Sequence, residues 1–259
     1  QLDTESLHKL ESYFGNNTDL RKIALATPVT REETIGKLID ITEQLDRDLK
    51  AYQRDNILRK LPHIMDGAVP SRRKVIYTAR AVFGNSNTEM KVNAFVNETS
   101  KTTHYHHGES SLAGTVTKMA QEFPGARHLP FLRPHGQFGT RSNGGKDSAD
   151  PRYTFTQLNK RLCFDMFPKE DDFLLKYVFD DGVRCEPLYY VPVIPISIME
   201  HMELPATGWK IKTWGRDWKE VIKNVRKLIM NKIKKASAMK IWLKDNIGDI
   251  RKYKGRDYS

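Results

Sequence analysis

The feature that most constrains the fold is the Gly- and Pro-rich stretch at residues 124–152, which reads PGARHLPFLRPHGQFGTRSNGGKDSADPR. Apolar residues recur at helical spacing on both sides of it. A loop this long inside a compact chain is unusual and tends to be functional. It ends on a charged residue followed by a phenol, Arg152 and Tyr153. We therefore expect the loop and its last two residues to carry function.

The segments around the loop predict several short helices. Apolar side chains repeat every three or four residues along five segments, which is typical of amphipathic helices. These segments are 35–49, 70–83, 109–123, 155–162 and 218–233. Thr30 and Glu33 form a capping-box pattern before the first of them. In the second, Val75, Ile76, Ala79 and Phe83 are expected in the core, with Arg72, Arg73 and Arg80 mainly outward.

Two further segments interrupt this helical pattern. Pro62, Gly67 and Pro70 predict a turn before the second helix. Residues 186–199, EPLYYVPVIPISIM, are aromatic and β-branched and predict strands, with Pro192 and Pro195 at edges or breaks. Basic helices separated by turns, with the Gly- and Pro-rich loop as a wing, favour a winged-helix (helix-turn-helix-like) module within an α+β fold.

Charge indicates the class of partner. The chain has 43 Lys and Arg against 32 Asp and Glu, a net charge of +11 with a pI near 9.5. Such a basic domain suggests a polyanion, although charge can also serve solubility alone. Acidic residues concentrate in the first fifty positions. Asp46 and Asp48 among them form a DxD inside a helical pattern, which indicates a solvated helix face.

Cysteine content and hydropathy exclude several classes of protein. Cys163 and Cys185 form no CxxC pair, which argues against a disulfide framework or a four-ligand zinc site and favours a reducing compartment. No apolar run approaches the ~18 residues of a membrane helix, and no signal peptide is recognisable. The missing initiator Met and the ending KGRDYS fit a piece of a longer protein.

Arg152 and Tyr153 suggest a particular chemistry. A tyrosine oxygen that attacks a DNA phosphodiester in line leaves a phosphotyrosine ester, from which the displaced sugar hydroxyl can reseal the strand. With an ordinary tyrosine pKa of about 10, the phenol needs help from nearby positive charge. Arg152 offers a planar, permanently charged fork for phosphate oxygens. On its own, however, an Arg-Tyr pair is common.

Two other stretches of the sequence could bind phosphate and so assist this reaction. HYHHGESS, residues 104–111, places three histidines before a predicted helix start, where an anion is favoured and His107 could hydrogen-bond a phosphate. The alternative is a surface histidine cluster or an adventitious metal site. VPSRRK, residues 69–74, opens a helix with three cations. Its alternative is a solvated basic face.

Taken together, the ordered motifs resemble one family. IMDGAVPSRRKVIYT, YHHGESSL, MAQEFPG, PHGQFGTRSNGGKDSADPRYTFT, FPKEDDFLLKYVFDDG, EPLYYVPVIP and TGW follow the order and spacing of the breakage–reunion core of type IIA DNA topoisomerases. The resemblance is to the eukaryotic and viral enzymes and covers roughly residues 51–227. It implies three parts: a helical connector from an upstream module (1–50), a winged-helix breakage–reunion domain (51–187) and a partial mixed α/β tower domain (188–259).

The resemblance also implies roles for individual residues. Tyr153 would join covalently to the 5′ phosphate of cleaved DNA, with Arg152 on the scissile phosphate. Arg73 matches a phosphate-binding arginine, and His107 matches the histidine that supports the transition state. The remaining DNA contacts implied by the resemblance are Lys91, Gln137, Gly139, Thr140, Arg141, Gly144, Gly145 and Lys146.

One segment departs from the family pattern. The family usually has Gly-Ile-Gly-Thr-Gly-Trp, whose isoleucine wedges between base pairs, whereas this chain has ELPATGW with Pro205 at that position. Proline is itself an apolar wedge, so Pro205 could bend DNA in its place. This and other differences fit an enzyme of a large cytoplasmic DNA virus, which would place it in the host cytoplasm; otherwise the nucleus is expected.

The resemblance implies cofactors and partners outside this chain. Mg²⁺ and ATP would be bound by upstream domains, so that the present chain binds double-stranded DNA but cuts it poorly or not at all; no metal ligand is assigned within it. The whole enzyme would be a homodimer that does not enter the membrane. Two alternatives remain: a non-catalytic winged-helix DNA-binding protein, or a His-hydrophobe-His tyrosine nickase using HYH at 104–106.

Overall fold

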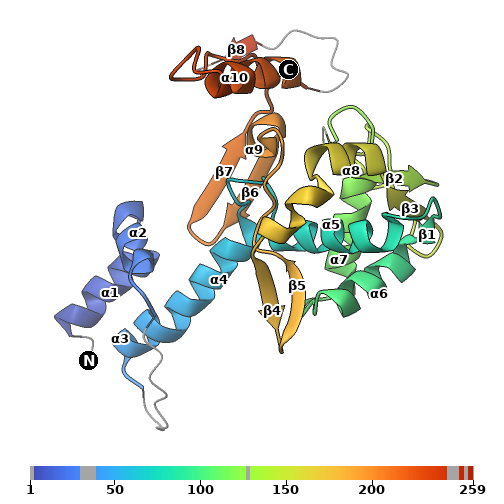
Figure 1. Cartoon of the computed structure of the whole chain (residues 1–259). Helices are drawn as coiled ribbons and strands as arrows, with labels where there is room; N and C mark the ends of the chain where they lie inside the picture. The colour runs from blue at the N-terminus through green and yellow to red at the C-terminus, as the bar shows by residue number, and fades with distance from the viewer. Residues whose placement is uncertain (1–2, 30–38, 127–128, 244–250, 254–255, 259) are drawn as a thin grey trace. The chain divides into compact units, whose positions relative to one another are not determined.

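The computed structural model describes residues 3–29, 39–126, 129–243, 251–253 and 256–258. The chain divides into two compact units. The first contains residues 1–61 and 203–211, and the second contains residues 62–202 and 212–259. Each unit has its own set of helices and strands (Figure 1).

The first unit is mainly helical. Its elements are α1 (Thr4–Phe14), α2 (Thr18–Ala26), α3 (Ile41–Gln44), a π-helical turn (Leu45–Leu49) and α4 (Lys50–Lys60). The predicted helix is present from Ile41, where the side chain of Asp40 caps it by accepting from the backbone N–H of Thr42 at 2.7 Å. The predicted capping box at Thr30 and Glu33 and the first residues of the apolar pattern, Ile35 and Leu38, lie outside the described residues.

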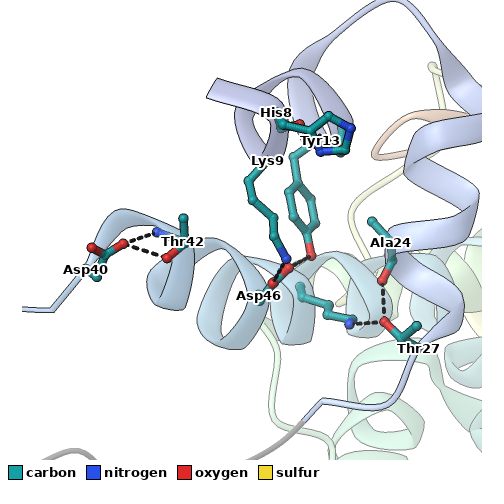
Figure 2. Close-up of polar contacts among 10 residues, drawn as sticks. His8, Lys9, Tyr13, Ala24, Thr27, Asp40, Thr42 and Asp46 are labelled. Carbon is teal, nitrogen blue, oxygen red and sulfur yellow. Dashed lines mark hydrogen bonds and ion pairs between the residues drawn. The ribbon is translucent and has the colours of Figure 1, made fainter. Parts of the chain in front are cut away.

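Side chains from several helices hold this unit together. Tyr13, Leu25 and Leu45 form its buried apolar cluster. Figure 2 shows Asp46 receiving both the Lys9 ammonium and the Tyr13 hydroxyl, the latter at 2.9 Å. Asp46 is therefore half-buried against α1, and its predicted place on a solvated face is wrong. The helical pattern around Asp46 could not show that α1 packs against it.

Residues 203–211 of a short hairpin complete the first unit. The hairpin consists of β6 (Met202–Ala206) and β7 (Trp209–Thr213), joined through Gly208 at a φ of +74°. Thr207 donates from its backbone N–H and its hydroxyl to the side-chain oxygen of Asn56 in α4, at 3.0 and 2.9 Å. These two bonds tie the hairpin turn to α4.

The second unit contains a three-stranded antiparallel sheet with the order β1-β3-β2, where β3 pairs with both neighbours. The strands are β1 (Met90–Lys91), β2 (Leu132–His135) and β3 (Phe155–Leu158), and the helices packed with them are α5 (Pro70–Phe83), α6 (Val92–Thr102), α7 (Glu109–Ala120) and α8 (Lys160–Met166). As predicted, the apolar face of α5 lies in the core: Val75, Ile76, Ala79 and Phe83 are at most 2% exposed.

The Gly- and Pro-rich loop is partly structured by this sheet. Its residues 132–135 form β2, and the segment from Gly136 to Thr154, which contains the remainder of the loop after β2, connects β2 to β3 (Figure 1). Helices followed by a small antiparallel sheet with a long strand connection are the winged-helix arrangement that the sequence predicts. Residues 155–158, predicted as helical, are instead strand β3, because they pair with strands on both sides.

The remaining elements of the second unit follow the sheet. They are a 3₁₀ helix (Lys169–Leu174), β4 (Tyr177–Asp180), β5 (Val183–Pro187), α9 (Ile196–Met199), α10 (Trp218–Ile229), β8 (Arg251–Tyr253) and β9 (Arg256–Tyr258). The prediction of strands at 186–199 is largely wrong: β5 ends at Pro187, 188–195 is irregular and 196–199 is helical. Pro192 and Pro195 remove the backbone donors that a strand ladder needs. The predicted helix α10 is confirmed and is capped by Asp217.

Within the described part of the chain, none of the helices combines the length and the apolar character needed to cross a lipid bilayer.

Candidate functional site

Tyr153 lies at the end of a tight turn that leads into β3. Its backbone N–H donates to the carbonyl of Asp150 at 2.9 Å, and the N–H of Arg152 donates to the Asp150 side chain at 2.9 Å. Asp side chains commonly organise turns in this way. The Tyr153 side chain is 72% exposed. The turn thus presents the phenol to solvent from a backbone fixed at both ends.

Arg152 is held beside this phenol. Its guanidinium donates to both carboxylate oxygens of Asp150, at 3.0 and 3.4 Å, and its Cζ lies 5.8 Å from the centre of the Tyr153 ring. These bonds to Arg152 lower the pKa of Asp150, so that its carboxylate stays charged at neutral pH. The pair is exposed and therefore weak. An incoming phosphate could replace Asp150 on the guanidinium at little cost.

The strand beside Tyr153 contributes a further cation. Lys91 pairs with Phe155 across β1 and β3, and its Nζ lies 5.9 Å from the centre of the Phe155 ring. The residues after Lys91 bond to the same turn, Val92 N–H to Thr154 O at 2.9 Å and Asn93 N–H to Pro151 O at 3.1 Å. The fold therefore brings exposed Lys91 next to the segment that carries Arg152 and Tyr153.

The loop before this turn is closed on itself. A Cβ on Gly139 would lie 2.6 Å from Gly145 Cα, and one on Gly145 would lie 2.3 Å from the Gln121 amide nitrogen. Both glycines also have positive φ, which side chains rarely adopt. Buried Gln121 donates to the carbonyls of Phe138 and Gly145, at 2.8 and 3.2 Å. Only glycine at these two positions allows the two sides of the loop to approach each other, and the Gln121 side chain at the end of α7, this closely.

A carboxylate closes the same loop from its other side. Asp147 accepts from the backbone N–H of Thr140 at 2.8 Å and from its hydroxyl at 2.7 Å. These hydrogen bonds lower the pKa of Asp147 to about 2. The carboxylate therefore holds Thr140 over the whole physiological pH range.

The loop offers a bound polyanion its side chains and not its backbone N–H groups. The N–H groups of Gly144, Gly145 and Lys146 donate to carbonyls within the loop, at 2.9–3.1 Å. Arg141 and Lys146 are exposed at its surface, as is Gln137. Positive charge for a polyanion thus comes from these cations and from Arg152, and the glycines serve to shape the loop.

The basic start of α5 is buried. Arg73 is 5% exposed, donates to both oxygens of Asp66 at 2.8 and 3.2 Å and also donates to Ala68 O. Arg72 is 2% exposed and forms a two-pronged pair with Glu200, one bond of which measures 2.8 Å. The prediction that Arg72 and Arg73 point outward is therefore wrong.

The next two cations of α5 are paired as well. Lys74 lies 2.8 Å from Glu186, and Arg80 binds Asp172 at 2.6 and 2.7 Å. The outward prediction for Arg80 is thus also wrong. These carboxylates lie far from α5 in the sequence, so the helical pattern could not reveal them.

His107 is exposed immediately before α7, with its ring edge-on to Tyr105 at 5.4 Å between centroids. Its neighbour His106 contacts Asp180 at 2.5 Å instead. Residues 104–106 form no strand, which the nickase alternative requires. Pro205 is exposed on β6 in the first unit.

The structure therefore gathers some of the sequence-predicted residues and leaves others in separate networks. Arg152, Tyr153 and Lys91 share one region of the sheet, and the closed loop leads into it. Arg73 faces Asp66 in the core, and His107 lies at the start of α7. The roles of Asp147 and Asp150 were not predicted from the sequence. For Asp150 the sequence does contain a local signal, because an Asp two residues before an Arg in a turn that contains Pro commonly organises that turn.

The described residues do not fit Mg²⁺. Among them, one group offers three or more potential metal ligands: His104, Asp180 and Asp181. An imidazole is a poor ligand for Mg²⁺, which prefers oxygen. Asp46 of the DxD pattern is engaged by Lys9 and Tyr13 (Figure 2).

Comparison with known proteins identifies the family of the chain. The DNA gyrase/topoisomerase IV family matches residues 59–255. DNA topoisomerase 2 of African swine fever virus (isolate Pig/Kenya/KEN-50/1950) is 40% identical over 236 residues, 88% of this chain and 20% of that protein. Human DNA topoisomerase 2-alpha is 40% identical over 185 residues, 71% of this chain and 12% of that protein.

A solved structure supports the fold. The Plasmodium falciparum topoisomerase II DNA-binding, cleavage and re-ligation domain matches with a TM-score of 0.84 and 33% identity, covering 97% of this chain and 34% of that one. The chain spans about a fifth of the length of its viral relatives. The family match covers well over half of the chain and includes the loop, the turn and Tyr153. The chain belongs to the DNA gyrase/topoisomerase IV family.

Proposed function

We propose that this chain is the DNA-binding and cleavage part of a type II DNA topoisomerase, with Tyr153 as its nucleophile. The phenolic oxygen bonds to phosphorus and gives up its proton, while the bond from phosphorus to the 3′ oxygen breaks. The 5′ phosphate stays on Tyr153, and the 3′ oxygen takes up a proton. The reverse attack by the 3′ hydroxyl reseals the strand, so the ester conserves the energy of the broken bond.

The geometry supports a role for each neighbouring cation. Arg152 binds the oxygens of the attacked phosphate in place of Asp150, and Lys91 adds charge from the adjacent strand. Fixed charge of this kind stabilises a transition state because it needs no reorganisation during the reaction. Arg141 and Lys146 contact the DNA backbone further along the loop. Gln137, Gly139, Thr140, Gly144 and Gly145 set the path of the loop along the DNA.

The roles proposed for Arg73, His107 and Pro205 rest on the resemblance. Arg73 would contact phosphate only by exchanging or sharing its bonds to Asp66. His107 is exposed and could reach a phosphate from the start of α7. Pro205 is exposed on β6, as a wedge between base pairs requires.

The proposal extends to the whole protein. It would act as a homodimer on double-stranded DNA, with Mg²⁺ and ATP bound by parts upstream of this chain, in the host cytoplasm if viral and otherwise in the nucleus. Residues 1–50 would be a connector, 51–187 the winged-helix domain and 188–259 the first part of a tower. The present chain alone would bind DNA but lack cleavage activity.

The observation that carries the proposal is the exposed Tyr153 held beside Arg152 at the end of a loop that presents cations. The test uses the full gene product with Mg²⁺, supercoiled plasmid and a denaturing quench. We expect linear DNA with protein on both 5′ ends, and complete loss of this product in Tyr153→Phe. Tyr52→Phe is the control, because Tyr52 is another exposed tyrosine, at 56%, in the first unit.

Two results would favour the alternatives. Nicked circles without linear DNA would indicate a nickase. DNA binding without any covalent product would indicate a winged-helix binding protein, and the assignment of Tyr153 as nucleophile would then be abandoned.

A further inference from the structure

We propose that His104, Asp180 and Asp181 form a binding site for a divalent transition-metal ion of the zinc class, with His106 as a supporting residue. Donor atoms of His104, Asp180 and Asp181 all lie within 4.8 Å of one another. The ring Nε2 of His106 lies 2.5 Å from Oδ2 of Asp180, a hydrogen bond that orients this carboxylate. One imidazole and two carboxylates are ligands that zinc accepts, with water in the fourth position.

The three donors and His106 come from two segments that the fold holds together. His104 and His106 follow the end of α6, and Asp180 and Asp181 lie at the tip of the β4–β5 hairpin. The hairpin tip is Asp181–Gly182, with φ of +47° and +76°, the geometry of a two-residue turn. His104 also has a left-handed φ, +46°, at a helix end where glycine is usual. Both backbones are thus fixed in conformations that aim these side chains at one site.

The charges at this place suit a cation. Asp180 and Asp181 supply two carboxylates to the site. Ligand atoms around tetrahedral zinc stand about 3.3 Å apart, given bonds of 2.0–2.1 Å. Because the three donor atoms lie no more than 4.8 Å apart, they need to approach one another by at most about 1.5 Å, which exposed and partly exposed side chains can do by small rotations.

The cysteine pattern excluded a zinc site built from thiolates, and this site uses none. A bound ion would fasten the β4–β5 hairpin to the 103–108 segment, in which His107 directly follows His106. The site is a separate prediction from the nucleophile, because its occupation can be measured without any DNA. A bound ion would also be distinct from the Mg²⁺ of the proposed cleavage reaction.

The test titrates the metal-stripped 259-residue chain with Zn²⁺ by calorimetry and with Co²⁺ by visible absorption. We expect one saturable equivalent and a cobalt spectrum typical of nitrogen and oxygen ligands. His104→Asn and Asp181→Asn each remove a ligand while keeping the local backbone, because Asn tolerates a left-handed φ and Asn-Gly is a favoured hairpin turn. Each should weaken zinc binding by about 100-fold or more, since even changes to residues that only support a ligand cost about 10–100-fold.

His8→Asn is the matched control, because His8 is an exposed histidine of the first unit. It should bind zinc as the unaltered chain does. The proposal is overturned if the chain shows no saturable equivalent, if His104→Asn and Asp181→Asn bind zinc normally, or if His8→Asn weakens binding as much as they do. Circular dichroism confirms that each variant is folded.

Discussion

Two regions of the second unit each carry three cations but use them in opposite ways. The first turns of α5 carry Arg72, Arg73 and Lys74, all largely buried and each bound to a carboxylate. The loop between β2 and β3 and the turn after it carry Arg141, Lys146 and Arg152, all exposed or partly exposed. A run of cations therefore does not by itself indicate a surface for DNA.

The difference lies in where the counter-charges come from. Arg73 meets Asp66 from the turn just before α5, whereas Arg72, Lys74 and Arg80 meet carboxylates about 90 to 130 positions later in the sequence. A buried charge without such a partner would cost several kcal/mol. In the loop, Asp147 and Asp150 are used to shape the backbone and to position Arg152. The loop cations, unlike those of α5, thus stay exposed and available to a phosphate backbone.

The largest effect should come from breaking a buried pair. We expect Arg72→Met to lower the free energy of unfolding by about 3–5 kcal/mol, because it leaves Glu200 buried and without the guanidinium. Arg141→Met removes an exposed cation and should change the free energy of unfolding by no more than about 0.5 kcal/mol. Urea unfolding followed by circular dichroism measures both. The double variant Arg72→Met with Glu200→Met should recover much of the lost free energy of unfolding. Equal unfolding curves for Arg72→Met and Arg141→Met would show that the buried α5 cation and the exposed loop cation do not differ in their contribution to stability.

An intermediate effect should separate two adjacent glycines of the loop. Gly144→Ala meets open space and should cost about 1–2 kcal/mol for its positive φ alone. Gly145→Ala has the same backbone penalty and in addition places a methyl group 2.3 Å from the Gln121 amide. We expect it to cost clearly more and to expose the loop to limited proteolysis. Equal sensitivity of the two variants to protease would show that the close passage over α7 does not hold the loop.

The smallest effect concerns the salt dependence of DNA binding. Each phosphate contact contributes about 0.9 to the slope of log K against log salt concentration. Arg141→Ala and Lys146→Ala should each reduce the slope by about that amount and weaken binding modestly. Lys74→Met removes a cation bound to Glu186 and should leave the slope unchanged. A slope that falls as much in Lys74→Met as in the loop variants would show that the α5 cations do contact DNA.

Much of the architecture could be predicted from local patterns. The apolar spacing of α5, α7 and α10 predicted their helices, and α5 and α7 each bury one face in the core of the unit. The Gly- and Pro-rich stretch predicted a long connection with a functional end. The resemblance then indicated Tyr153, and the structure shows its side chain exposed.

The errors share one physical cause, which is that long-range partners leave no local signal. Residues 155–158 have helix-like spacing but become a strand because β1 and β2 offer hydrogen bonds on both sides. The local pattern predicts Arg72 on the surface, but in the fold Arg72 binds Glu200, which lies 128 positions later in the sequence. The local pattern likewise predicts Asp46 on a solvated face, but in the fold Lys9 and Tyr13 of α1 bind it.

The pairing of α5 also has a practical consequence for expression. Its cations form ion pairs with Asp66, Asp172, Glu186 and Glu200. A shortened recombinant version that stopped at residue 187 would retain three of these acids and strand Arg72 in an apolar interior. Any soluble truncation of this unit should therefore keep its terminus beyond Glu200, even though Tyr153 and its loop lie well upstream.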